Sequence, residues 1–203
     1  SNPDKPISKG KVTQSGNYNT MRVGGDYVYL LSDFNASIVN GRDAIGEYVP
    51  SVQGKLVEDS NICMPQYVRG DTYTVVSSFS LKNPEEKVDS KAIFGCSGLV
   101  YVSKNNIYVC ESYYNSDDSD VTQTCIRKIS YKNGILKAVG QTRIDGTLND
   151  SFSLDEYEGN LRLVTTVSSN GDSGIMPLVL FGDSADSEIA KQEDTNYLYI
   201  LDE

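Results

Sequence analysis

The chain has 203 residues, of which 38% are hydrophobic and 23% charged, a balance that excludes both a disordered chain and a membrane-embedded one. It contains no histidine, which excludes Ser-His-Asp and Cys-His nucleophilic catalysis and almost every catalytic zinc site. With 18 basic and 28 acidic residues the net charge is −10, so neither nucleic acid nor an anionic membrane is an expected partner. No apolar run reaches the ~18 to 20 residues that a membrane span needs.

Short segments rich in Val, Ile, Tyr and Thr alternate with Gly, Asn and Asp clusters, a pattern typical of strands joined by hairpin turns. Residues 1–17 are expected to form a flexible N-terminal segment. The first four strands are expected at 20–23 and 27–32 and, after a long excursion, at 72–81 and 88–94. Their turns contain Gly and Asn, which reach positive φ at low cost and so join antiparallel strands.

Four further strands are expected at 98–103, 107–113, 124–131 and 135–144, and four antiparallel strands in about 45 residues is the size of one propeller blade. Strands at 152–157, 161–167 and 196–201 then begin a third unit, while 184–193 is interpreted as a loop with one helical turn. The sequence therefore predicts an all-β fold of antiparallel four-stranded blades. It is an incomplete β-propeller over 18–203, with blade units of about 18–95, 96–145 and 146–203.

Three segments resemble a bacterial and archaeal family of secreted β-propeller-domain proteins that is distantly related to WD40 repeats. They are residues 151–166 (SFSLDEYEGNLRLVTT), 72–81 (TYTVVSSFSL) and 100–109 (VYVSKNNIYV). The resemblance implies an extracytoplasmic propeller, often on secreted or membrane-anchored proteins, with no established enzymatic activity and no catalytic residues to transfer. The family's domain is more than twice this length, so the chain resembles its N-terminal part. We expect any signal or anchor to lie outside this chain.

The four cysteines are Cys63, Cys96, Cys110 and Cys125, and they have no C-x-x-C spacing, which argues against a zinc knuckle. They can form two disulfides or remain four buried thiols. A hairpin of 107–113 with 124–131 places residues whose numbers add to about 235 opposite each other. Cys110 and Cys125 would then be cross-strand neighbours, close enough for a disulfide.

Two acidic clusters are candidate sites. Asp117, Asp118 and Asp120 lie in the loop 115–120 and could bind Ca²⁺, but the loop lacks the ligand spacing of an EF-hand, so a solvated hairpin tip is the favoured interpretation. No other cofactor is expected.

Asp155 and Glu156 could suggest the paired carboxylates of glycoside hydrolysis. Adjacent strand residues point to opposite faces, so a structural role is favoured, with Arg162 as an ion-pair partner of the acidic side chains. No residue is assigned a catalytic role.

Two further features have competing interpretations. The tripeptide 69–71 (RGD) is a sequence that integrins bind, but it lies at a predicted turn, where Gly and Asp are favoured for their geometry. The 14 tyrosines could line a carbohydrate-binding face, although most are expected to fill the space between blades.

These observations favour a non-catalytic, extracytoplasmic propeller module that binds or scaffolds a protein or carbohydrate at the cell surface. An Asp/Glu-dependent hydrolase of cell-wall or polysaccharide substrates is one alternative. The other is an assembly module that a partner chain completes.

The last expected strand, 196–201, is nearly all apolar and has no fourth strand beside it. A free strand edge pairs readily with another chain. We therefore expect self-association through this edge, or further blades that cover it in the native protein.

Overall fold

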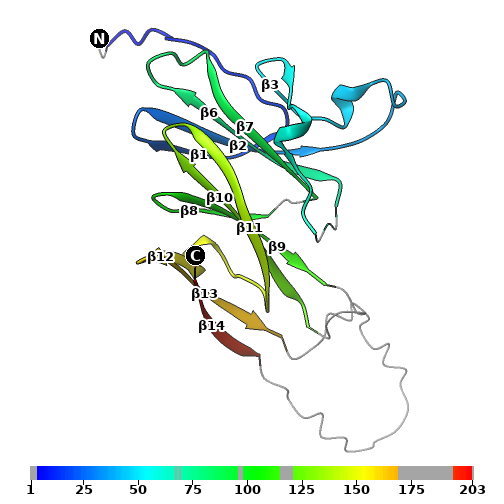
Figure 1. Cartoon of the computed structure of the whole chain (residues 1–203), viewed down its shortest axis with the longest axis vertical. Helices are drawn as coiled ribbons and strands as arrows, with labels where there is room; N and C mark the ends of the chain where they lie inside the picture. The colour runs from blue at the N-terminus through cyan, green and yellow to red at the C-terminus, as the bar shows by residue number, and fades with distance from the viewer. Residues whose placement is uncertain are drawn as a thin grey trace, which may run out of the picture. The chain divides into compact units, whose positions relative to one another are not determined.

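The computed structural model describes residues 4–66, 68, 70–95, 98–114, 121–168 and 194–202 (Figure 1). These residues form strands and a few short 3-10 helices, and they separate into two compact units. Unit 1 comprises Ser1–Glu111 and Cys125–Thr142, and unit 2 comprises Ser112–Thr124 and Arg143–Glu203. None of the helices in this described part of the chain is long and apolar enough to cross a membrane.

The first sheet lies in unit 1 and has the strand order β1-β2-β6-β7-β5. Its strands are β1 (Asn17–Gly24), β2 (Tyr27–Asn35), β6 (Thr72–Ser80), β7 (Lys87–Phe94) and β5 (Ile62–Cys63). β2 pairs antiparallel with β6 from Tyr27↔Ser80 to Asn35↔Thr72, whereas β5 runs parallel to β7. All of β6 except its two end residues is buried, because this central strand is covered on both faces.

The second sheet has the strand order β11-β10-β9-β8. Its strands are β8 (Leu99–Val102), β9 (Asn106–Tyr113), β10 (Gln123–Lys132) and β11 (Ile135–Asp145). β8 pairs antiparallel with β9 from Leu99↔Cys110 to Val102↔Ile107. The strands follow one another along the chain in the sheet order, as the four-strand pattern of the sequence predicts.

The core of unit 1 joins these two sheets. It takes Tyr29 and Leu31 from β2, Val76 and Ile93 from β6 and β7, and Ile107, Val109, Ile129 and Leu136 from the second sheet. All eight side chains are 3% exposed or less. Burying a side chain of this size contributes about 1.5–3 kcal/mol relative to leaving it in water, so this shared core holds the two sheets of unit 1 together.

Between β2 and β6 the chain forms small elements that the sequence pattern did not predict. They are the 3-10 helices η1 (Ile45–Glu47) and η2 (Asp59–Asn61), the two-residue strands β3 (Ser51–Val52) and β4 (Lys55–Leu56), and β5. The N-terminal segment packs here as well. The Gln14 side-chain amide donates to Ser32 Oγ at 2.8 Å and to the Val75 carbonyl at 3.1 Å. The end of the segment expected to be flexible is thus anchored to the first sheet.

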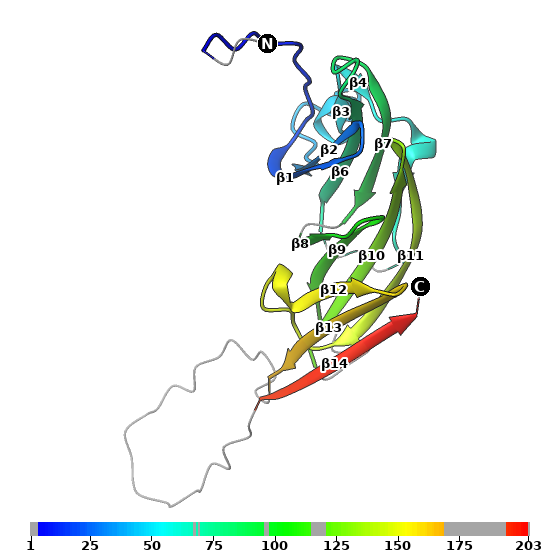
Figure 2. The same ribbon diagram turned by 90° about the vertical axis from the view of Figure 1, so that its left-hand side faces the viewer.

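Unit 2 contains the third sheet, in which β12 (Leu154–Tyr157), β13 (Asn160–Val167) and β14 (Thr195–Asp202) lie side by side in that order (Figure 2). A 3-10 helix, η3 (Ser151–Ser153), precedes β12. The Asp150 carboxylate accepts a hydrogen bond from Phe152 N at 2.8 Å and so caps this turn. Local capping therefore replaces the first two residues of the strand expected at 152–157.

The strands expected from the sequence all appear, with ends that differ by three residues at most. The structure is all-β. It has two antiparallel four-stranded blades, the first of which is extended by β5, and a third blade with three described strands. This arrangement is an incomplete propeller. The loop expected at 184–193 lies outside the described residues.

Candidate functional site

A cavity of about 720 Å³ lies in unit 1, where three hairpin turns meet. The turns join β1 to β2, β8 to β9, and β10 to β11. The residues that line the cavity are 22–27, Tyr29, 102–105 and 131–133. We call it the turn cavity. Its volume is within the ~300–1,000 Å³ typical of ligand pockets.

The turns form because their residues reach positive φ at low cost. Gly25 has a φ of 60°, and the consecutive residues Asn133 and Gly134 have φ values of 51° and 82°. Two consecutive positive φ angles make the tight hairpin turn whose twist matches that of the flanking strands. In the β8–β9 turn, Ser103 N donates to the Asn106 carbonyl at 2.9 Å, and Ser103 Oγ accepts from Asn106 N at 3.0 Å.

The rings of Tyr29 and Tyr131 both line the turn cavity, and we call this ring pair its floor. The ring centroids of Tyr29 and Tyr131 are 4.5 Å apart, and Tyr29 is 1% exposed. Tyr29 Oη accepts from Gly134 N at 3.0 Å, and Tyr131 Oη donates to the Ser103 carbonyl at 2.6 Å. Burial raises the pKa of Tyr29, which keeps its hydroxyl neutral. A Cβ on Gly24 would lie 3.3 Å from the Tyr29 ring, so glycine here lets β1 lie against the floor.

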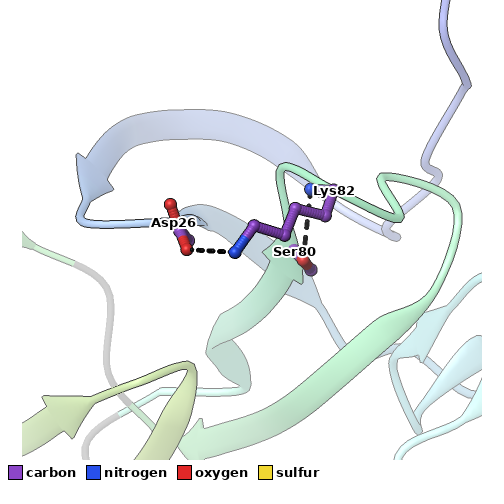
Figure 3. Close-up of polar contacts among 3 residues, drawn as sticks. All are labelled: Asp26, Ser80 and Lys82. Carbon is purple, nitrogen blue, oxygen red and sulfur yellow. Dashed lines mark hydrogen bonds and ion pairs between the residues drawn. The ribbon is translucent and has the colours of Figure 1, made fainter.

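The rim of the turn cavity is exposed and basic. It carries Arg22, Lys104 and Lys132 and a single carboxylate, Asp26. The Lys82 ammonium, which follows β6, donates to Asp26 Oδ2 at 2.7 Å (Figure 3). This hydrogen bond to Asp26 raises the pKa of Lys82. Since Lys82 compensates the charge of Asp26, the three cations on the rim give the cavity a net positive charge.

The sequence contains one signal for this site, a dipeptide that occurs in two turns. Both Lys104-Asn105 and Lys132-Asn133 are Lys-Asn pairs at the tip of a turn, and the structure brings the two tips together. Tyr73 and Tyr108 are buried core residues, and Tyr29 is buried in the core while also lining the turn cavity. The half-buried Tyr27 and Tyr131 line the turn cavity as well and pack against the core.

Within the described part of the chain, Cys63, Cys110 and Cys125 are not joined by disulfide bonds. Contacts between β9 and β10 indicate a register one residue away from the expected one. Tyr131 N donates to the Asn105 carbonyl at 2.8 Å, and Lys128 Nζ lies 6.0 Å from the Tyr108 ring centroid, so the numbers of opposed residues add to 236.

A shift of one residue turns a side chain to the other face of a sheet. In this register the residue opposite Cys110 would be Ile126, and the contact between Cys110 and Cys125 stays a prediction. Cys110 and Cys125 are each 2% exposed and behave as small buried hydrophobic residues.

The expected ion pair of Arg162 is confirmed. Asp155 lies opposite Arg162 in the β12–β13 register, and the Arg162 guanidinium makes two hydrogen bonds to the Asp155 carboxylate. Glu156 lies opposite Leu161 instead. The hydrogen bond from Arg162 lowers the pKa of Asp155, whereas a general acid in glycoside hydrolysis needs a raised pKa.

Asp117, Asp118 and Asp120 lie outside the described residues, and so do Arg69 and Cys96. Among the described residues no group of three or more Cys, Asp or Glu side chains is placed to hold a metal ion. The Asp71 carbonyl, in the described part of the RGD tripeptide, accepts from Ala36 N at 2.8 Å.

The strand β14 forms an edge of the third sheet. Within the described residues it pairs with β13 alone, from Thr195↔Val167 to Asp202↔Asn160. Leu198 and Ile200 are 68% and 63% exposed, and Tyr197 is 45% exposed. The apolar edge expected from the sequence is therefore present in unit 2.

Comparison with known proteins agrees with this architecture. A family model described as Beta propeller domain matches residues 1–203. A comparison with curated proteins gives no match. The match covers the whole chain, and the successive, mainly antiparallel sheets of the structure are consistent with propeller blades. The chain thus belongs to the Beta propeller domain family.

Proposed function

We propose that the chain is a non-catalytic propeller module that binds a ligand or partner at the cell surface through the turn cavity. The observation that carries this proposal is the cavity itself, in which the exposed polar rim of three separate turns surrounds the paired rings of Tyr29 and Tyr131. Ligand pockets in proteins commonly combine an apolar base with a few convergent polar groups.

The non-catalytic role is supported by the chemistry of the carboxylates. The lining of the turn cavity includes one carboxylate, Asp26, which is paired with Lys82. Asp155, the other candidate acid, is paired with Arg162. Hydrolysis of a glycosidic bond needs two free carboxylates on either side of the bond. Incubation with a panel of polysaccharides and assay of new reducing ends tests the hydrolase alternative.

Amide NMR of the chain tests where small molecules bind. We expect a fragment library of sugars, sugar acids and short peptides to shift mainly the amides of 22–27, 102–105 and 131–133. The variant Asn105→Trp places a bulky ring on the exposed rim and should abolish these shifts. Lys55→Trp, at an exposed position on β4, is the matched control and should leave them unchanged. Fragments that shift other surfaces equally in both variants would overturn the proposal.

An extracytoplasmic location is part of the proposal, and its support is the resemblance of residues 72–81, 100–109 and 151–166 to secreted propeller proteins. Fractionation of the producing cells with an antibody against the chain tests it. Recovery of the chain in the cytoplasmic fraction would contradict it.

A second candidate function is assembly through β14, which the exposure of Leu198 and Ile200 favours. An edge strand exposes unpaired backbone groups that a second copy can pair with. We expect light scattering to show a concentration-dependent dimer that Ile200→Lys abolishes. Ile7→Lys, at a position 83% exposed in the N-terminal segment, should not affect it. A strict monomer at all concentrations would remove this candidate.

A further inference from the structure

We infer that the turn cavity binds a short anionic oligosaccharide, two or three sugar rings long, that carries carboxylate or sulfate groups. This inference rests on the proposed function and names the class of ligand for the same cavity. It follows from the charge of the rim, from the polar groups left open on it, and from the charge of the rest of the chain.

The distribution of charge is the first observation. The cavity is lined by 3 of the chain's 18 Lys and Arg residues but by 1 of its 28 Asp and Glu residues. Within the described part of the chain, Lys104 and Lys132 make no ion pair. The carboxylate of Asp26 already has Lys82 as its partner. An anionic group entering the cavity therefore meets cations whose charge is not compensated.

The open polar groups are the second observation. Among the described residues the side-chain amides of Asn105 and Asn133 make no hydrogen bond, and both line the cavity beside a lysine. A carboxamide both donates and accepts, which suits the hydroxyl groups of a sugar. The rings of Tyr27 and Tyr131 add half-buried aromatic surface of the kind against which the apolar face of a sugar ring packs.

The charge of the whole chain limits the length of the ligand. A net charge of −10 repels a long polyanion, and this repulsion is screened only beyond about 10 Å at 0.1 M salt. A cavity of about 720 Å³ accommodates a few sugar rings without extending the ligand over the acidic surface. The arrangement selects a short anion and disfavours nucleic acid and other long polyanions.

Isothermal titration calorimetry with trigalacturonate, against its fully methyl-esterified form, tests the inference. We expect the acid to bind and the neutral ester to bind at least about tenfold more weakly, because the ester cannot form charge-assisted hydrogen bonds with the lysines of the rim. Affinity should fall as NaCl is raised from 0.05 to 0.5 M. The double variant Lys104→Ala/Lys132→Ala should lose at least tenfold, whereas Lys55→Ala should bind as the unaltered chain does.

The Asp26–Lys82 pair provides a sharper test, because Lys82 does not line the cavity. Lys82→Ala should weaken binding of trigalacturonate by leaving the Asp26 carboxylate uncompensated, and the added change Asp26→Asn should restore it. Equal binding of acid and ester, or unchanged binding by Lys104→Ala/Lys132→Ala, would overturn the inference. Tighter binding of adenosine monophosphate or of an acidic peptide would assign the cavity to that class instead. The NMR test of the turn amides is independent of these titrations. Shifts at the turns without binding of trigalacturonate would overturn this inference and leave the proposed function standing.

Discussion

The buried ion pair of Arg127 and Glu111 in unit 1 allows a quantitative test of how the second sheet is stabilised. Arg127 Nη2 lies 2.7 Å from Glu111 Oε1, and the two side chains are 4% and 10% exposed. Charges withdrawn from water to this extent are stable only while they are paired. Glu111→Gln keeps the shape of the side chain and removes its charge. It should therefore lower the free energy of unfolding by about 3–5 kcal/mol.

A double-mutant cycle separates the pair from its surroundings. The double variant Glu111→Leu/Arg127→Met replaces both charges with apolar groups and should lose less stability than the sum of its two single variants. Urea unfolding followed by circular dichroism and by the fluorescence of the 14 tyrosines measures each variant.

The pair Asp155 and Arg162 is the matched control. It is also a cross-strand pair, but its side chains are 52% and 40% exposed. An exposed pair contributes little, so Asp155→Asn should leave the urea midpoint nearly unchanged. If Glu111→Gln behaves like Asp155→Asn, or if the losses of the Arg127 and Glu111 variants simply add, the reasoning about the buried pair is refuted.

Three other predictions concern the strands and the cavity floor. Tyr29→Phe removes the acceptor of the Gly134 N–H and should lower the free energy of unfolding by about 1–3 kcal/mol. Because the folded-state pKa of Tyr29 lies above the ordinary 10.0, its stabilisation is present below pH 10.0 and is lost as the pH rises through the raised pKa. Urea titrations at a series of pH values should show this loss for the unaltered chain and not for the variant. Gly98→Ala places a Cβ 2.2 Å from the Cys110 carbonyl oxygen and should lower the melting temperature of the chain. Gly140→Ala, whose Cβ would have no atom within 4 Å, should raise the free energy of unfolding by about 0.4–1 kcal/mol. The opposite order of stabilities would contradict the strand packing. Alkylation of the denatured, unreduced protein should label both Cys110 and Cys125 in mass spectrometry, and a disulfide-linked peptide pair would disprove the β9–β10 register.

Much of the architecture is visible in the sequence because it depends on local sterics. The alternation of Val, Ile, Tyr and Thr with polar residues has the period of a strand, and Gly, Asn and Asp occupy the turns for which positive φ is needed. The third strand of the third blade is expected at 196–201, and the structure has this strand at Thr195–Asp202. The pairing of Arg162 with an acidic side chain was also expected from the local sequence, and the register of the tight hairpin selects Asp155 as the partner.

What the pattern could not indicate depends on residues far apart in the chain. The β9–β10 loop is long, so turn chemistry does not determine the β9–β10 register, and the contact of Tyr131 with Asn105 gives a register one residue from the expected one. The parallel strand β5 is two residues long, too short to show any period. The Asp26–Lys82 ion pair spans 56 residues, and nothing in either local segment specifies the other.

The sequence by itself determined the strand positions, the turn positions and the all-β class, because each of these is decided by the conformational preferences of neighbouring residues. The tertiary structure alone decided the site. The turns at Gly25, Lys104 and Lys132 form a cavity only because the core packing of unit 1 brings their strands together at one end. Convergence of this kind is a property of long-range packing, and strand periodicity contains no information about which turns will meet.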